Sequence, residues 1–78
     1  MWIRHNYALY NSSDIVKIYT FRSKLKAEFR NGTTAYIGDF NTSKECEDIF
    51  NSVSRALLFE DKDNPGIIIK DTKGKKDE

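Results

Sequence analysis

Cysteine and histidine are almost absent from this 78-residue chain, each occurring once, as Cys46 and His5. A lone cysteine cannot form an internal disulfide, and the sequence holds no CxxC or HxxxH spacing of the kind that binds zinc. We therefore expect no metal and no cofactor. A core this small typically supplies no more than about 3–5 kcal/mol of net stability, so tight packing or self-association has to supply the rest.

An excess of one charge is also missing. The chain has 13 basic and 12 acidic residues, a net charge of +1, whereas dedicated duplex-DNA binders usually carry a clear basic excess. No apolar run approaches the ~18 residues of a membrane span, and the opening MWIRHNYALY lacks the apolar stretch of a signal peptide. One unpaired cysteine suits a reducing compartment, so we expect a cytoplasmic protein with no membrane partner.

The patterns that are present predict one α+β domain, an antiparallel β-meander of four or five strands packed on one amphipathic helix. We expect this domain to span residues 1–69. The apolar residues 66–69 would form a short C-terminal strand at a sheet edge, or an arm that binds a second copy. The polar, charged residues 70–78 are expected to form a disordered tail.

The strongest strand signal is the Asn31-Gly32 pair between two strand-like runs. Asn-Gly favours a two-residue type I′ turn, because both central residues of that turn need positive φ. Such a turn would pair Lys26 with Ile37, and side chains would alternate between two faces. The inner face would carry Leu25, Ala27, Phe29, Thr34, Tyr36 and Gly38. The outer face would carry Lys24, Lys26, Glu28, Arg30, Thr33, Ala35, Ile37 and Asp39.

The segment DIVKIYTFR predicts the preceding strand, because it is rich in β-branched and aromatic residues. A tight turn at Arg22-Ser23 would pair Tyr19 with Lys26. The inner face would then gain Val16 and Ile18, and the outer face would gain Ile15, Lys17, Tyr19 and Phe21. Two shorter strands, WIR and YALY, would come before this segment.

An amphipathic helix is expected after the strands. Thr42 and Glu45 have the spacing of a capping box, and apolar residues then recur on one helical face. These residues are Cys46, Ile49, Phe50, Val53, Ala56 and Leu57. We expect this stripe to pack on the inner face of the sheet, where Gly38 would let the helix backbone approach closely.

Candidate catalytic groups are few. His5 lacks the partners that a general base needs. Cys46 lies near the N-terminus of the predicted helix, where the helix dipole can activate a thiol, but it belongs to the apolar stripe, where cysteine is usually a small core residue. No GxxxxGK[ST] or GxGxxG phosphate loop occurs. We do not expect an enzyme.

The outer face of the predicted sheet is the candidate binding surface, because Tyr19, Lys26 and Ile37 would lie side by side on it. Three interpretations remain open. The N-terminal strands or residues 66–69 could cover this face; it could dock a protein, including a second copy; or its rings could stack on single-stranded nucleic acid while lysines hold phosphates. The expected contact residues are Lys17, Tyr19, Phe21, Lys24, Lys26 and Ile37.

The order MWIR, ALYNSSDIVKIY, a charged hairpin and YIGDFNTSKECEDIF resembles a class of short proteins from Gram-positive bacteria and their phages. Ile37, Gly38 and Phe40 fill the Leu-Gly-x-(Tyr/Phe) motif of that class, and the resemblance covers residues 1–58. It implies a β-meander capped by a helix and implies no activity. HNY replaces the usual polar-Gly turn, and the NPGIIIK extension is not part of the pattern.

The sequence therefore predicts a small, non-catalytic, intracellular protein-binding module. By size and resemblance, it would be an inhibitor or regulator encoded by a phage or mobile element, which occludes a larger host protein or forms a homodimer. The alternative is a nucleic-acid-binding protein that uses the aromatic and lysine residues of the same outer face.

Overall fold

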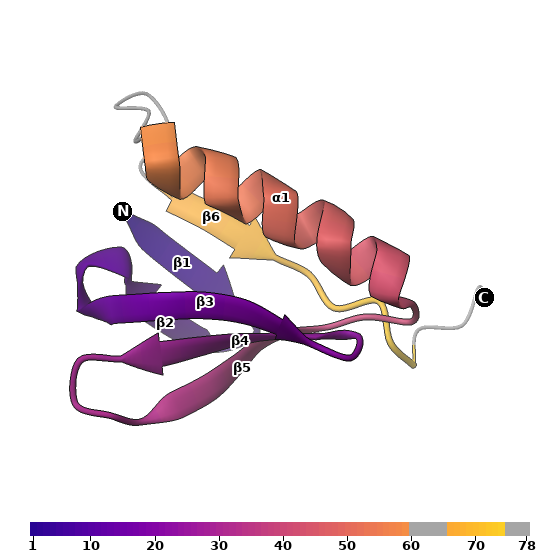
Figure 1. Cartoon of the computed structure of the whole chain (residues 1–78), viewed down its shortest axis with the longest axis horizontal. Helices are drawn as coiled ribbons and strands as arrows, with labels where there is room; N and C mark the ends of the chain where they lie inside the picture. The colour runs from indigo at the N-terminus through magenta and orange to yellow at the C-terminus, as the bar shows by residue number, and fades with distance from the viewer. Residues whose placement is uncertain (60–65, 75–78) are drawn as a thin grey trace.

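A computed structural model describes residues 1–59 and 66–74 and confirms the α+β class (Figure 1). Five strands precede the helix, and a 3-10 turn, η1 (Ser12–Asp14), separates the second strand from the third. Among the residues described after the helix, 66–74, there is one strand. In chain order the elements are β1 (Trp2–His5), β2 (Ala8–Asn11), β3 (Ile15–Phe21), β4 (Lys24–Phe29), β5 (Thr34–Asp39), α1 (Ser43–Phe59) and β6 (Gly66–Ile69).

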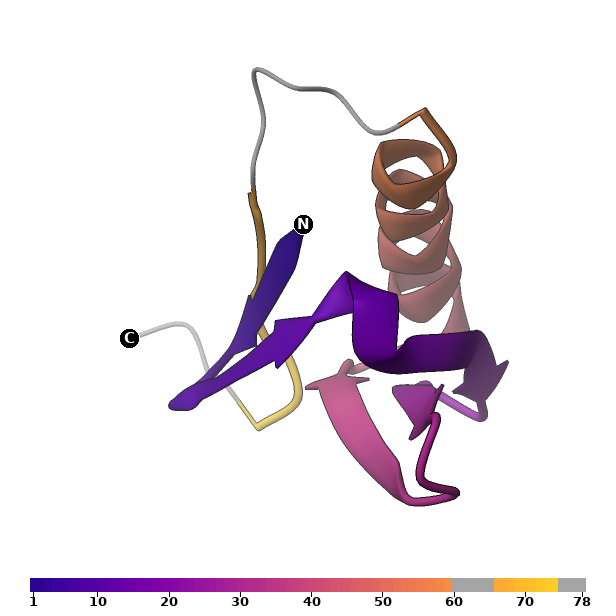
Figure 2. The ribbon, with the colours of Figure 1, turned by 90° about the vertical axis from the view of Figure 1, so that its left-hand side faces the viewer.

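The strands form two three-stranded sheets. The meander β3-β4-β5 is antiparallel throughout, whereas the second sheet has the order β2-β1-β6, with β6 parallel to β1. In the turned view, this second sheet stands to one side of α1 and of the meander (Figure 2). Residues 66–69 are therefore a strand of the domain, and neither they nor β1 and β2 belong to the meander sheet.

The core lies between α1 and the two sheets. Its buried residues come from every layer: Ile3, Leu25, Ala27, Ile37, Phe40, Cys46, Val53 and Ile69. The predicted helix stripe is confirmed, since Cys46 and Val53 are buried and Ile49, Phe50 and Leu57 pack against the cluster. Gly38 admits the ring of Phe40 and the side chain of Ile69 rather than the helix backbone, because a Cβ there would lie 2.7 Å from the ring.

Of the two hydrogen bonds in the predicted capping box, one forms at the start of the helix. The Glu45 backbone N–H donates to the Thr42 hydroxyl at 3.1 Å, as that motif requires. The Glu45 carboxylate, however, accepts a hydrogen bond from the Thr72 hydroxyl instead of reaching back to Thr42. The side chain that would have completed the cap thus joins the helix to the segment after β6.

The register of β3 and β4 is confirmed around the turn Arg22-Ser23, where Tyr19 pairs with Lys26 and Ile18 with Ala27. Arg22 takes a positive φ of 59°. The prediction is wrong further from the turn, because a bulge lies between Ile15 and Lys17. The bulge brings Ile15 to the core and leaves Val16 exposed, since an extra residue reverses the alternation of side chains.

The predicted type I′ turn between β4 and β5 is wrong. Phe29 N–H donates to the Thr33 carbonyl at 2.8 Å and Gly32 N–H to the Phe29 carbonyl at 2.9 Å, which makes a three-residue loop. Only Gly32 in this loop has a positive φ, of 87°. Asn31 instead uses its side-chain oxygen to accept from Thr33 N–H at 3.0 Å, a local bond typical of asparagine in turns.

The longer loop moves the register by one residue, so that Lys26 pairs with Tyr36 instead of Ile37. A second irregularity restores the pairing of Leu25 with Gly38 and leaves Ile37 as the extra residue. Ile37 is 0% exposed and belongs to the core, whereas Tyr36 is 47% exposed. The predicted positions of these two neighbours, Tyr36 inside and Ile37 outside, are therefore both wrong.

Residues 71–73, in the segment expected to be a tail, form hydrogen bonds with the rest of the domain, and residues 75–78 of that segment lie outside the described residues. Asp71 Oδ1 accepts from the Asp39 backbone N–H at 2.8 Å and lies 2.8 Å from His5 Nε2. Thr72 N–H donates to the Asp39 carbonyl at 3.0 Å. These bonds attach the end of β6 to the junction between β5 and α1.

Candidate functional site

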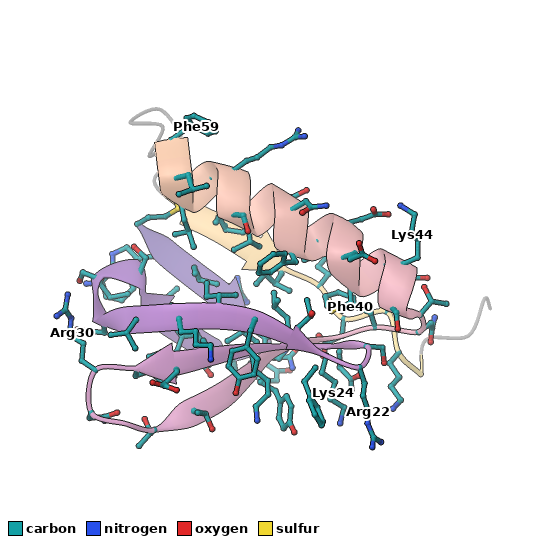
Figure 3. The ribbon with its side chains drawn as sticks, viewed as in Figure 1. Arg22, Lys24, Arg30, Phe40, Lys44 and Phe59 are labelled. Atoms are coloured by element: carbon teal, nitrogen blue, oxygen red, sulfur yellow. The ribbon has the colours of Figure 1, made fainter. Side chains whose placement is uncertain are left out.

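The face of the meander sheet that points away from α1 gathers cations and aromatic rings. We call it the lysine–aromatic face. Figure 3 shows Arg22 and Lys24 extending from this side, opposite the helix. Because β3, β4 and β5 alternate their side chains, the face receives residues from all three strands and from one turn. Its members are Lys17, Tyr19, Phe21, Arg22, Lys24, Lys26 and Tyr36.

Lys26 is the centre of this face, because it projects from the middle strand. Its Nζ lies 5.0 Å from the ring centroid of Tyr36 on β5. The same Nζ lies 5.8 Å from each of the rings of Tyr19 and Phe21 on β3. All three distances are within the range of a cation–π attraction. One amine therefore interacts with the rings on both neighbouring strands.

The other cations lie around this centre, each near one ring. Lys24 Nζ is 4.9 Å from the Tyr36 ring, and Lys17 Nζ is 4.8 Å from the Tyr19 ring. The Arg22 guanidinium is 5.5 Å from the Phe21 ring. Each ring on the face thus has at least two cationic neighbours.

The rings remain accessible between the lysine stems. Phe21 is 49% exposed, similar to Tyr36. Lys24 and Lys26 are partly buried, as expected when long charged side chains lie along apolar surface and keep their amines in water. An approaching planar or anionic group would meet both ring surface and amines.

The electrostatic field of this face is positive, although the chain as a whole is nearly neutral. Its four cations stand against Glu28, which pairs across the strands with Lys17, and Asp39 at the edge beside Lys24. Within the described residues, the ion pairs join His5 to Asp71 and Lys44 to Asp48. None of them neutralises a cation of the lysine–aromatic face.

Five of the six predicted contact residues lie on this face, and Ile37 does not. The predicted patch, in which Tyr19 and Ile37 flank Lys26, does not exist, because Ile37 is in the core. Tyr36 occupies the position predicted for Ile37, and Arg22, which the sequence predicts only as a turn residue, adds a cation. The register of the β4–β5 hairpin is the signal that would have found Tyr36.

The two side chains considered for catalysis, Cys46 and His5, are engaged within the fold. Cys46 is 1% exposed. Burial raises the pKa of its thiol above the usual range, and the carboxylates of Asp39 and Glu47 raise it further. A thiol that stays protonated and shielded is a poor nucleophile. His5 contacts Asp71, as described above. Within residues 1–59 and 66–74, no three His, Cys, Asp or Glu side chains gather as a metal site would require.

A second surface feature is an open groove of about 510 Å³ beside the β2-β1-β6 sheet. Tyr10 and Phe29 stack there with ring centroids 5.4 Å apart, and Arg30 is its cationic residue. Arg30 Nε already donates to the Ser13 carbonyl at 2.8 Å. This groove thus has one cation, held against η1, and the Asp14 carboxylate also lines it, whereas the lysine–aromatic face has four cations.

No helix in the described part of the chain is long and apolar enough to cross a membrane. In comparisons with known proteins, no family model, no curated protein and no solved structure matches this chain.

Proposed function

We propose that this protein is a non-catalytic binding module and that the lysine–aromatic face is its contact surface. One observation carries the proposal: three rings and four cations from three neighbouring strands and the β3–β4 turn are interleaved on one open sheet face, with Lys26 between the rings. The opposite face of the same sheet already packs in the core, so stability does not require this grouping.

The energetics of the free protein favour a binding role over a structural one. An exposed cation–π contact contributes only about 0.5–1 kcal/mol. Bringing four cations close together costs electrostatic repulsion, and half-exposed rings such as Phe21 forgo much of the stabilisation that burial would give. A partner that neutralises the cations and covers the rings would remove both costs.

A binding module without catalytic activity acts by covering a surface of its partner. The small size of this protein and the resemblance of its sequence to short proteins of Gram-positive bacteria and their phages favour an inhibitor or regulator that covers part of a larger macromolecule in the cytoplasm. The partner is an anionic surface, either an acidic protein or a nucleic acid. A second copy docked symmetrically through this face is disfavoured, because it would set Lys26, Lys24 and Arg22 against the same cations.

Affinity capture from a host extract tests the proposal, with proteins identified by mass spectrometry and cross-linked nucleic acids by sequencing. The face variant is Lys24→Glu with Lys26→Glu. The control is Lys44→Glu with Arg55→Glu, which makes the same charge change on exposed positions of α1. We expect the face variant to lose specific partners that the wild type and the control retain. Equal capture by all three folded proteins would refute the proposal.

A further inference from the structure

We propose, building on the binding role of the lysine–aromatic face, that its partner is a single-stranded nucleic acid. Bases stack on the exposed rings of Tyr36 and Phe21, and phosphates are neutralised by the surrounding lysines and Arg22. Single-strand-binding proteins commonly combine aromatic platforms with a basic surface that follows the backbone.

The central position of Lys26 favours a nucleic acid over a protein. The buried centre of a protein–protein interface is depleted in charged residues, and lysine in particular is under-represented there. Here the centre is a lysine amine with rings on either side, and the aliphatic residue that would have suited a dry interface, Ile37, lies in the core. Phosphate oxygens can accept hydrogen bonds from such amines, so a polyanion avoids leaving a buried charge unpaired.

The spacing of the rings suits a flexible single strand. Phe21 and Tyr36 project from β3 and β5, and these two strands lie roughly 10 Å apart at ordinary strand spacing, with β4 between them. Lys24 and Lys26 project between them from β4. Stacking surface and cations therefore alternate across the sheet. In a duplex the base faces are already stacked on one another and are not available to these rings.

The cation–π contacts within the free protein are weak enough for a nucleic acid to replace them. The cations lie 4.8–5.8 Å from the ring centroids, and each such contact is weak at an exposed site. On binding, a lysine amine moves from a ring face to a phosphate, and a base takes its place on the ring. The free protein thus holds its stacking surfaces and its cations in adjacent positions.

The test measures fluorescence anisotropy of labelled 15-nucleotide oligo-dT and oligo-U, titrated with the full chain at 50 and 200 mM salt. With three to four phosphates neutralised, we expect affinity to fall about 20- to 50-fold between the two salt concentrations. Lys24→Ala with Lys26→Ala should weaken binding at 50 mM and flatten the salt dependence. The matched control, Lys44→Ala with Arg55→Ala on α1, should change neither quantity.

The ring contribution is tested separately. Tyr36→Ala should weaken binding by about 5- to 150-fold, the range for loss of one base-stacking contact, and should leave the salt slope unchanged. Tyr36→Phe should restore most of the affinity, because the ring alone is needed. Circular dichroism confirms that each variant is folded before it is titrated.

Three outcomes would overturn the inference. The first is no binding of either oligonucleotide at about 100 µM protein, a concentration at the weak end of non-specific nucleic-acid binding. The others are equal or tighter binding of a duplex of the same length, and an unchanged affinity in Tyr36→Ala. If the wild type nevertheless captures a protein that the face variant loses, the binding role stands and only the class of partner is wrong. If the face variant captures everything that the wild type does, both proposals fail.

Discussion

Lys26 and Tyr36 are cross-strand neighbours on β4 and β5, and the Lys26 amine lies 5.0 Å from the centre of the Tyr36 ring. This pair exists because the β4–β5 loop has three residues rather than two. With a two-residue turn, Lys26 would face Ile37 and the Tyr36 ring would point into the core. The chemical character of the open sheet face therefore depends on the conformation of one loop, which suggests tests of that loop and of the packing around it.

Gly32 should tolerate alanine poorly. Its φ of 87° is in the left-handed region, and a Cβ there would meet no other atom within 4 Å, so backbone strain alone sets the effect. We expect Gly32→Ala to lower the free energy of unfolding by about 1 kcal/mol, measured by urea denaturation. Gly32→Asn should lose less, because asparagine enters this region more readily. Equal losses for both variants would contradict the assigned loop.

Gly38→Ala should be destabilising for a different reason, overpacking. The new methyl group would lie 2.7 Å from carbon atoms of the Phe40 ring and 3.3 Å from Ile69. Forcing extra atoms into a packed core typically costs about 1–3 kcal/mol. Phe40→Leu alone creates a cavity, but combined with Gly38→Ala it removes the clash, so the double variant should be more stable than the sum of the two single losses. Additive losses would show that the ring does not limit position 38.

Asp71 should stabilise the fold although it lies beyond the last strand. Its carboxylate accepts the Asp39 backbone N–H and contacts His5. Removing it leaves a partly buried N–H without its partner, at a cost of about 1–3 kcal/mol. We expect Asp71→Ala to lower the urea midpoint clearly, and Lys73→Ala, an exposed neighbour, to leave it almost unchanged. Similar behaviour of the two variants would indicate that residues 70–74 do not hold β6 in place.

Because of the Cys46 thiol, the free energy of unfolding should decrease at alkaline pH. Burial raises the pKa of its thiol in the folded protein, whereas the unfolded thiol ionises near 8.5. Below about pH 8.5 the thiol is protonated in both the folded and the unfolded protein, and its full contribution to the free energy of unfolding is present. As pH rises from there through the folded pKa, ionisation favours the unfolded chain and the contribution is lost, by up to about 1.4 kcal/mol per pH unit.

Urea titrations of wild type and Cys46→Ala between pH 7 and 10 check this prediction. The difference between the two free energies of unfolding isolates the thiol, because lysines and tyrosines titrate in both proteins. Thiol-reactive dyes should label the native wild type slowly and the urea-unfolded protein rapidly. A pH-independent difference, or fast labelling of the native state, would place the thiol at the surface instead.

The parts of the fold that local pattern determines were predictable from the sequence. The helix follows from apolar spacing, and its stripe from Cys46 to Leu57 faces the core as expected. The β3–β4 register near the turn follows from matched alternation on two strands, which correctly placed Tyr19 beside Lys26. Five of the expected contact residues followed from that register.

The remaining errors arise from choices that local sequence leaves open. Asn-Gly suits either a two-residue turn or a longer loop with glycine in the left-handed position, so the pairing of Tyr36 was undetermined. The position of Ile37 depends on the packing of Phe40 and Ile69 over Gly38, which involves a strand far along the chain. The parallel partnership of β1 with β6 has no local signal, because the two segments are separated by almost the entire sequence.

That partnership also determines when the domain can fold during synthesis. Of the buried core residues, Ile3 is synthesised first, yet it lies in a sheet whose third strand, β6, is synthesised after the helix. The β3–β5 meander can form early from neighbouring contacts, while Ile3 stays exposed to water and to chaperones until Ile69 has emerged. Folding is therefore completed only after translation has passed the final strand, and a ribosome stalled within α1 would hold a nascent chain with an open core.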